Sequence, residues 1–205
     1  MHIPDGVLSG PVLATTTAFS AAGVGIGLYK MDPERIPRVG VLASVFFVAS
    51  LIRVPIGPSS AHLLLIGLLG FVLGWSVFPA LAVALLLQAI LFGFGGVTSL
   101  GANVLSMATP ALVCYYLFGR RLRPDSTPGA AFALAFAAGV VGVALACGMV
   151  GLTLYASGRE FVASIGALAV GHIPVAVVDG SVAGFIVSFL HKVRPELLER
   201  PLADS

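Results

Sequence analysis

Residues 128–156 read PGAAFALAFAAGVVGVALACGMVGLTLYA and contain no charged side chain. A helix that crosses the hydrocarbon core of a bilayer needs about 20 consecutive apolar residues, and this run exceeds that length. A membrane β-strand would instead alternate apolar and polar residues over about 10 positions. A helix also satisfies its backbone hydrogen bonds within one segment, as the bilayer demands. The run therefore predicts a transmembrane α-helix.

The rest of the chain has the same apolar character. Hydrophobic residues make up 58% of its 205 residues and charged residues 10%, whereas about 25% of the residues in soluble domains are charged. Because a residue before proline avoids the helical conformation, His172-Ile173-Pro174 is expected to divide the last apolar segment into a short helix over 160–171 and a span from about 174 to 192. The prediction is an all-α integral membrane protein with about seven transmembrane helices, in one domain over residues 1–205. The other apolar segments lie at 9–29, 38–54, 62–75, 78–93 and 101–118.

Basic residues are distributed unevenly between the predicted spans. Of the 11 Lys and Arg residues, all but Arg53 and Arg159 fall on one side of the predicted membrane. Basic residues gather on the cytoplasmic side, so we expect the N-terminus outside, the C-terminus in the cytoplasm, and a multi-pass protein of the cell (inner or plasma) membrane. The first residues lack the pattern of a signal peptide. We therefore expect Met1, which precedes the large residue His2, to remain at the N-terminus.

Met1 and His2 together offer three nitrogen donors to a metal ion. The α-amine has an ordinary pKa of about 7.7–8.0, so part of it is a neutral donor at neutral pH. The amide nitrogen and the Nδ1 atom of His2 follow, each one chelate ring further along. Nickel(II) and copper(II) favour planar nitrogen sites, and cobalt(II) is a weaker candidate. The first two residues thus predict a planar metal site that lacks one ligand.

Two histidines on the same predicted side could supply the fourth nitrogen. His62, at the start of the third apolar segment, is the first choice, and His172 is the reserve. The ordinary alternative is that His2 is exposed at a frayed chain end and that His62 is an interfacial histidine with hydrogen-bond partners. The residues alone leave these alternatives open.

Polar side chains in the Gly-rich segment 93–103 are candidates to support this site. Thr98, Ser99 and Asn103 can hydrogen-bond the N-terminal segment or the ligating imidazoles, which normally need such partners. Asp5 is expected to cap the first helix rather than to accept a hydrogen bond from a ligand. A carboxylate inside a span, such as Asp179, costs about 2.5–3.5 kcal/mol on insertion scales. We therefore expect it to face the bundle and to have a partner, for which Gln88 is one candidate.

The opening MHIPDGVL (residues 1–8) resembles the start of the CbiM/NikM family, the substrate-binding membrane subunits of cobalt and nickel energy-coupling-factor transporters. The resemblance implies a seven-helix subunit in which the metal is held by the N-terminal amine, the amide and imidazole of residue 2, and a second histidine. These correspond to Met1, His2 and His62, which places His62 ahead of His172. The matching stretches that follow are GPSSAH (57–62), QA (88–89) through GGVTSLGANV (95–104), HIP (172–174) with DG (179–180), and KVRPELL (192–198).

The sequence lacks the phosphate loop GxxxxGK[ST], so it is not expected to hydrolyse ATP itself. It also has no Ser–His or HExxH arrangement that would indicate an enzyme. The resemblance implies that a transmembrane coupling subunit and ATPase subunits drive uptake of the Ni(II) or Co(II) that this chain captures. In some relatives a small accessory membrane subunit takes part, and no nucleic acid is expected. The alternative is a self-sufficient divalent-metal channel or secondary transporter.

Overall fold

The computed structural model describes residues 2–51, 53–56 and 59–198, and these residues are mostly helical. Two short antiparallel strands, β1 (Arg53–Ile56) and β2 (Ser59–His62), pair with Arg53 opposite His62. Single 3-10 turns cover Pro33–Arg35, Gly74–Ser76, Gly119–Arg121, Arg159–Phe161 and Pro195–Leu198. The α-helices are α1 (Gly10–Tyr29), α2 (Ile36–Ala49), α3 (Ile66–Leu73), α4 (Val77–Phe92), α5 (Leu100–Leu117), α6 (Pro128–Ser157), α7 (Val162–Gly171) and α8 (Ile173–Val193).

Helix α6 confirms the prediction from residues 128–156. Thr127 precedes it, and the Thr127 hydroxyl accepts a hydrogen bond from the Ala130 amide, which caps the first turn. Pro128 occupies the first position, where proline costs no helical hydrogen bond. The predicted break at His172 is also present, because α7 ends at Gly171 and α8 starts at Ile173 with Pro174 in its first turn.

Several helices are long and apolar enough to cross a membrane, so the chain is a multi-pass membrane protein. The predicted count of seven spans is not confirmed. The third and fourth apolar segments form one stretch through a 3-10 turn, and α2 has 14 residues, fewer than the about 20 that a straight span needs. Five such stretches lie in the described part of the chain: Gly10–Tyr29, Ile66–Phe92, Leu100–Arg121, Pro128–Ser157 and Ile173–Val193.

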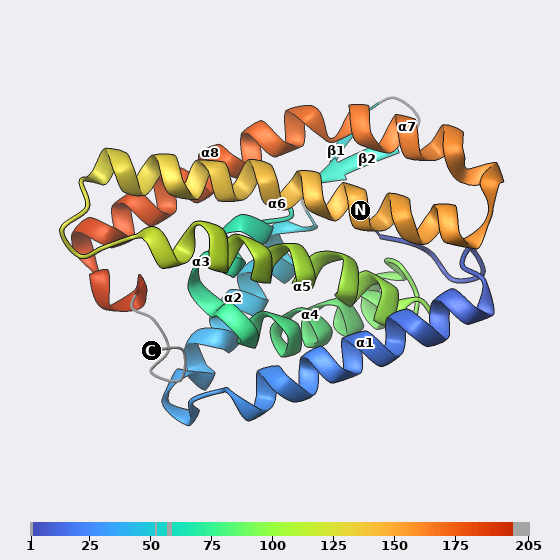
Figure 1. The fold of residues 1–205 in the computed structure, drawn as a ribbon, viewed down its shortest axis with the longest axis horizontal. Helices are drawn as coiled ribbons and strands as arrows, with labels where there is room; N and C mark the ends of the chain where they lie inside the picture. The colour runs from blue at the N-terminus through green and yellow to red at the C-terminus, as the bar shows by residue number, and fades with distance from the viewer. Residues whose placement is uncertain (1, 52, 57–58, 199–205) are drawn as a thin grey trace.

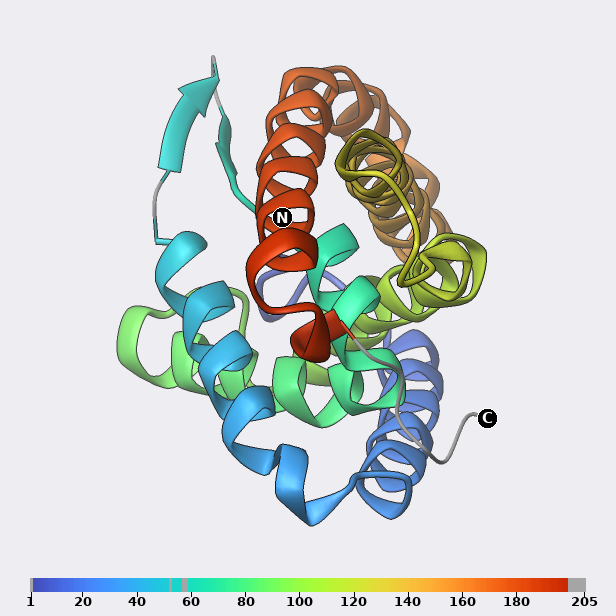
Figure 2. The ribbon, with the colours of Figure 1, turned by 90° about the vertical axis from the view of Figure 1, so that its left-hand side faces the viewer.

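The region between α2 and α3 departs from the all-α prediction. Helix α2 ends at Ala49 and α3 begins only at Ile66, so part of segments 38–54 and 62–75 belongs to the hairpin. Figure 2 shows the two strands at the edge of the helix bundle, beside α8. The apolar residues alone could not predict this, because short apolar runs fit helices and strands equally well.

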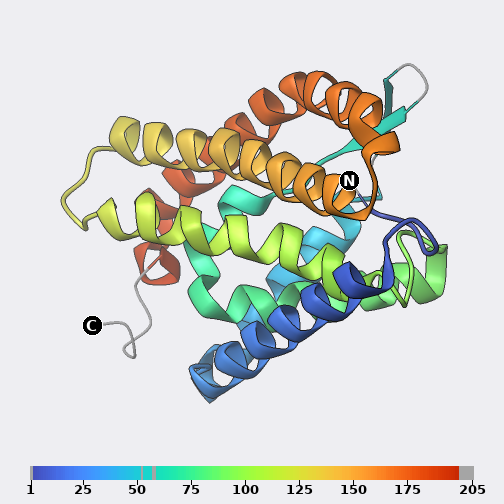
Figure 3. The ribbon, with the colours of Figure 1, turned by 45° about the vertical axis from the view of Figure 1, so that its right-hand side comes forward.

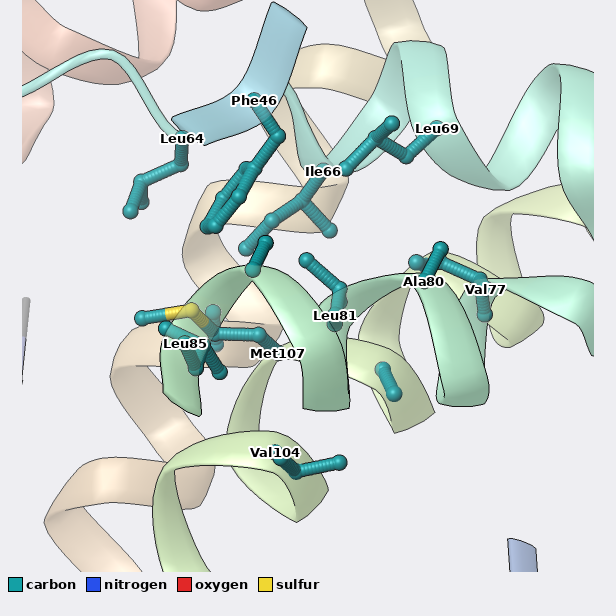
Figure 4. Close-up of a cluster of buried hydrophobic side chains, with 14 of the residues drawn as sticks. Phe46, Leu64, Ile66, Leu69, Val77, Ala80, Leu81, Leu85, Val104 and Met107 are labelled. Carbon is teal, nitrogen blue, oxygen red and sulfur yellow. The ribbon is translucent and has the colours of Figure 1, made fainter. Parts of the chain in front are cut away.

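Helix α3 lies at the centre of the protein. Each of its residues is buried, as expected of a helix that is apolar on all sides. Figure 4 shows the apolar side chains that meet there from four parts of the chain: Phe46, Leu64, Ile66, Leu69, Val77, Leu81, Leu85, Val104 and Met107. This packing holds α3 against α4 and α5 and fixes the start of α3, where the His62 segment enters.

Different helix ends and connections lie at the two ends of the molecule's long axis. Figure 1 shows the end of α1, the connection between α5 and α6, and the end of α8 at one end of the molecule. The start of α1, the end of α6 and the start of α7 lie at the other. The N-terminal segment crosses this second end and runs beside the loop between α4 and α5, as Figure 3 shows.

Candidate metal centre

The N-terminal segment is anchored within the protein from its third residue. The side chain of Ile3 is buried, and its amide donates to Asn103 Oδ1 at 2.8 Å. Its carbonyl accepts from Ser99 Oγ at 2.7 Å and from Asn103 Nδ2 at 3.0 Å. Both backbone polar groups of Ile3 are thus paired with side chains at the start of α5. His2, the next residue toward the N-terminus, is therefore held in a defined place.

Asp5 secures the same segment from the other side. Its Oδ1 atom accepts from Thr98 Oγ1 at 2.6 Å and from the Ser99 amide at 3.0 Å. These hydrogen bonds, that of Thr98 first, hold the pKa of the carboxyl below its ordinary value. The expectation that Asp5 caps α1 is wrong, because its carboxylate points to the α4–α5 loop and the Ser9 amide donates instead to Ser157 Oγ at 3.2 Å.

Two glycines let the loop approach the N-terminal segment. Gly95 has φ 75°, a left-handed conformation, and a Cβ there would lie 2.8 Å from Asn103 Nδ2 and 3.6 Å from His2 Cβ. A Cβ on Gly96 would overlap the carboxylate of Asp5. Side chains at these positions would push the loop away from His2.

The imidazole of His2 is oriented by Gln88, which sequence reasoning considered only as a partner for Asp179. His2 Nε2 lies 2.9 Å from Gln88 Oε1. The Gln88 Nε2 atom donates to Ser50 Oγ, so its amide oxygen faces the ring. Because that oxygen can only accept, His2 Nε2 carries a proton, and when the ring is neutral its lone pair is on Nδ1. This is the atom that closes a chelate ring with the backbone nitrogen of the same residue.

His62 lies beside His2, and its ring is hydrogen-bonded through the opposite nitrogen, Nδ1 instead of Nε2. The ring centroids are 5.0 Å apart and the ring planes are tilted by 33°. His62 is 4% exposed. Its Nδ1 atom donates to the Leu63 carbonyl oxygen at 3.1 Å, because a carbonyl can only accept, and its lone pair is therefore on Nε2. Each imidazole thus has one nitrogen suited to a metal.

The separation of the two rings fits a shared ion. Metal–imidazole bonds of about 2.0–2.1 Å place each ring centroid about 3 Å from the ion, so rings on adjacent corners lie about 4.5 Å apart. The distance of 5.0 Å between the centroids needs only a small adjustment to reach that arrangement. The predicted ligand Met1 lies outside the described residues.

His172, the reserve ligand, is placed differently. Its side chain is buried, and its Nδ1 atom donates to the Leu168 carbonyl at 2.8 Å. Its Nε2 atom has no hydrogen-bond partner in the described residues. Within that part of the chain, no ring contact joins His172 to His2 or His62. Nor do three His, Cys, Asp or Glu side chains gather there as a metal cluster.

Comparisons with known proteins agree with the membrane fold. Residues 2–197 match the CbiM family, described as "Cobalt uptake substrate-specific transmembrane region". A protein of Haemophilus influenzae, named as a metal transport protein, is 40% identical over 201 residues, which cover 98% of each chain. An Archaeoglobus fulgidus protein, named as a fused nickel transport protein NikMN, is 31% identical over 99% of this chain and 70% of its own length.

A solved structure has the same fold. The crystal structure of a truncated transition metal transporter matches with a TM-score of 0.76 and 26% sequence identity, over 94% of this chain and 99% of that one. The family comprises transport proteins rather than enzymes, in agreement with the prediction. The chain therefore belongs to the CbiM family of cobalt-uptake, substrate-specific transmembrane proteins.

Proposed function

We propose that this chain is the substrate-binding subunit of an energy-coupling-factor transporter and captures Ni(II) or Co(II) at the N-terminus. The ligands are the α-amine of Met1, the amide nitrogen and Nδ1 of His2, and Nε2 of His62. The observation that carries the proposal is the pair of adjacent imidazoles of His2 and His62, 5.0 Å apart. Their hydrogen bonds to Gln88 and the Leu63 carbonyl leave lone pairs on the two nitrogens that the planar site requires.

The chemistry of the donor set favours a strongly polarising ion. The amide nitrogen of His2 binds only after it loses its proton, and four nitrogens in a plane suit nickel(II). In the general order of affinity, nickel(II) also binds more tightly than cobalt(II). The amine, the amide and both rings must release or lack a proton to bind the metal. Metal affinity is therefore expected to decrease as the pH is lowered.

The distribution of charge supports an outside N-terminus. Lys30, Arg120 and Lys192 lie at or beside the ends of α1, α5 and α8. These helix ends gather at one end of the molecule, and α1 starts at the other (Figure 1). Basic residues mark the cytoplasmic side. The metal is thus captured at the outer side of the cell membrane, within the single membrane domain.

Partner subunits supply the energy. The sequence has no phosphate loop for ATP, and the A. fulgidus relative is named as a fused nickel transport protein of which this chain covers 70%. This supports an assembly with a transmembrane coupling subunit and ATPase subunits, with or without a small accessory membrane subunit. Thr98, Ser99, Asn103 and Asp5 hold the N-terminal segment in place, and His172 remains a candidate for indirect support of the site.

Uptake into vesicles distinguishes this function from the alternative of a self-sufficient channel or secondary transporter. Proteoliposomes with the chain, the coupling subunit and the ATPase subunits are expected to accumulate radioactive nickel only when ATP is present on the ATPase side. Vesicles with the chain alone should bind nickel but not accumulate it. ATP-independent accumulation by the chain alone would establish the channel or secondary transporter instead.

Gln88 provides a test of the proposed ring orientation. Gln88→Met keeps the size of the side chain and removes the acceptor for His2 Nε2–H, so the proton can move to Nδ1 and compete with the metal. We expect nickel affinity to fall about 10- to 100-fold, the usual cost of losing a partner that orients a metal-bound histidine. Gln88→Glu, which retains an acceptor, is the matched control. Calorimetry that gave the Met variant the affinity of the unaltered protein would contradict this role.

A further inference from the structure

The carboxylate of Asp179, two turns into α8, is buried and contacts the segment that follows His62. Its Oδ1 atom accepts from the Leu64 amide at 3.0 Å and from the Leu65 amide at 2.8 Å. Its Oδ2 atom is buried and has no hydrogen-bond partner in the described residues. Gln88, the candidate partner that the sequence offered, contacts His2 and Ser50 instead. A carboxylate inside a membrane span is costly, and its hydrogen bonds in the described part of the chain stabilise only this one turn.

The turn has an unusual backbone that needs such support. Leu65 has φ 49°, a left-handed conformation that is uncommon for a residue other than glycine. Helix α3 begins directly after it, and Leu65 itself provides no side-chain cap. Amides at the start of a helix lack partners within that helix. Asp179, from another helix, accepts instead from the two amides that directly precede α3.

Glycines hold Asp179 at a fixed distance from this turn. A Cβ on Gly139 of α6 would lie 2.5 Å from the Cα of Gly180, the neighbour of Asp179 on α8. A Cβ on Gly67 of α3 would overlap the backbone of Gly139. The three helices thus meet backbone to backbone, an approach that only small residues permit, and α8 has little room to move relative to the start of α3.

One peptide group connects Asp179 to the imidazole of His62. The carbonyl of Leu63 accepts from His62 Nδ1, and the amide of the same peptide unit, that of Leu64, donates to Asp179 Oδ1. The chain of hydrogen bonds thus runs from His62 through the Leu63–Leu64 peptide to a carboxylate. Hydrogen bonds in such chains polarise one another, and a carboxylate behind a metal-bound histidine fixes the ring and raises its basicity.

We propose that Asp179 is a positioning residue for the metal site, which fixes the orientation and the proton position of His62 through the Leu63–Leu64 peptide. This inference rests on the proposed function, in which Nε2 of His62 is a metal ligand. It also makes α8 a part of the site, although α8 supplies no ligand. A displacement of α8 from the start of α3 would release His62 from its position.

The test uses full-length protein in detergent and two variants of different severity. Asp179→Leu keeps a similar volume and removes the acceptor, and nickel affinity is expected to fall about 10- to 100-fold. The visible absorption band of the bound nickel should shift toward that of His62→Ala. Asp179→Asn keeps Oδ1 but removes the charge, so a smaller loss of about three- to tenfold is expected, because hydrogen bonds to charged groups are about twice as strong as neutral ones. Ser181→Ala on the same helix is the matched control and should change neither quantity.

A double-mutant comparison separates positioning from a general structural role. In the His62→Ala background, Asp179→Leu should cause no further loss of nickel affinity, because the group on which it acts is absent. An equal loss in both backgrounds would overturn the inference. If the Asp179→Leu variant does not fold, the test uses the nitrogen-15 resonance of His62 Nδ1 in Asp179→Asn. This resonance is expected to shift, because the charge at the end of the hydrogen-bond chain is removed. An unchanged resonance together with unchanged affinity would overturn the inference, whereas a failure of the unaltered protein to bind nickel would overturn the proposed function itself.

Discussion

Acetylation of the α-amine of Met1 is expected to weaken nickel binding by on the order of 1,000-fold, equivalent to about 4 kcal/mol. The acetylated nitrogen is an amide and no longer a neutral amine donor, and the chelate ring that it shares with the His2 amide is lost. Without an amine to hold the metal beside it, the His2 amide no longer loses its proton. Two of the four nitrogen ligands are therefore lost together. Calorimetry on the acetylated and free forms measures the difference. Equal affinities would show that the amine is not a ligand.

A genetic version of this experiment needs two added residues rather than one. A single residue before Met1 would place the histidine third, where an amine, two amides and the imidazole can form a four-nitrogen site of their own. With Gly-Ser in front of Met1 the histidine is fourth, and the planar set is broken. The same dipeptide after Ser205 is the matched control and should leave the affinity unchanged.

Substitution of His62 by alanine is expected to reduce nickel affinity by about 100-fold, because water replaces one nitrogen of a planar set that nickel(II) prefers. Three donors from Met1 and His2 remain, so binding is weakened but not abolished. The absorption band of the bound nickel should also move to longer wavelength, because water is the weaker ligand.

His172→Ala is the matched control for this substitution. It removes another buried histidine, whose Nδ1 donates to the Leu168 carbonyl of its own helix. We expect the nickel affinity of this variant to remain within about threefold of the unaltered protein, because in the described residues His172 contacts neither His2 nor His62 and so does not orient a ligand, unlike the partners whose loss costs about 10- to 100-fold. A large loss in His172→Ala with little change in His62→Ala would reverse the assignment of the fourth ligand.

The sequence predicts those parts of the fold that depend on local chemistry. Continuous apolar character and the Thr127-Pro128 start determine α6, and Pro174 determines the separation of α7 from α8. The turn at Leu65, after which α3 starts, contacts instead Asp179, which is more than 100 positions away along the chain. No local pattern around Leu65 indicates such a contact.

In the candidate site, too, some residues could be predicted from the sequence and some contacts could not. Polar residues in a Gly-rich loop on the predicted outer side indicated that Thr98, Ser99 and Asn103 could contact the N-terminal segment. The structure places their side chains on Ile3 and Asp5. Gln88 was considered as one candidate partner of Asp179 but contacts His2 and Ser50, because a polar residue inside a span indicates a buried contact but not which one. The position of Gln88 near the end of α4, just before the Gly-rich loop, could have indicated a contact with the N-terminal segment.

Nickel-edge X-ray absorption of the loaded, unaltered protein tests the account most directly. The spectrum is expected to show a planar site of four nitrogen donors, with the outer-shell scattering of two imidazole rings, from His2 and His62. A six-coordinate site dominated by oxygen donors, or scattering from fewer than two imidazoles, would contradict a metal held between the beginning of the chain and His62.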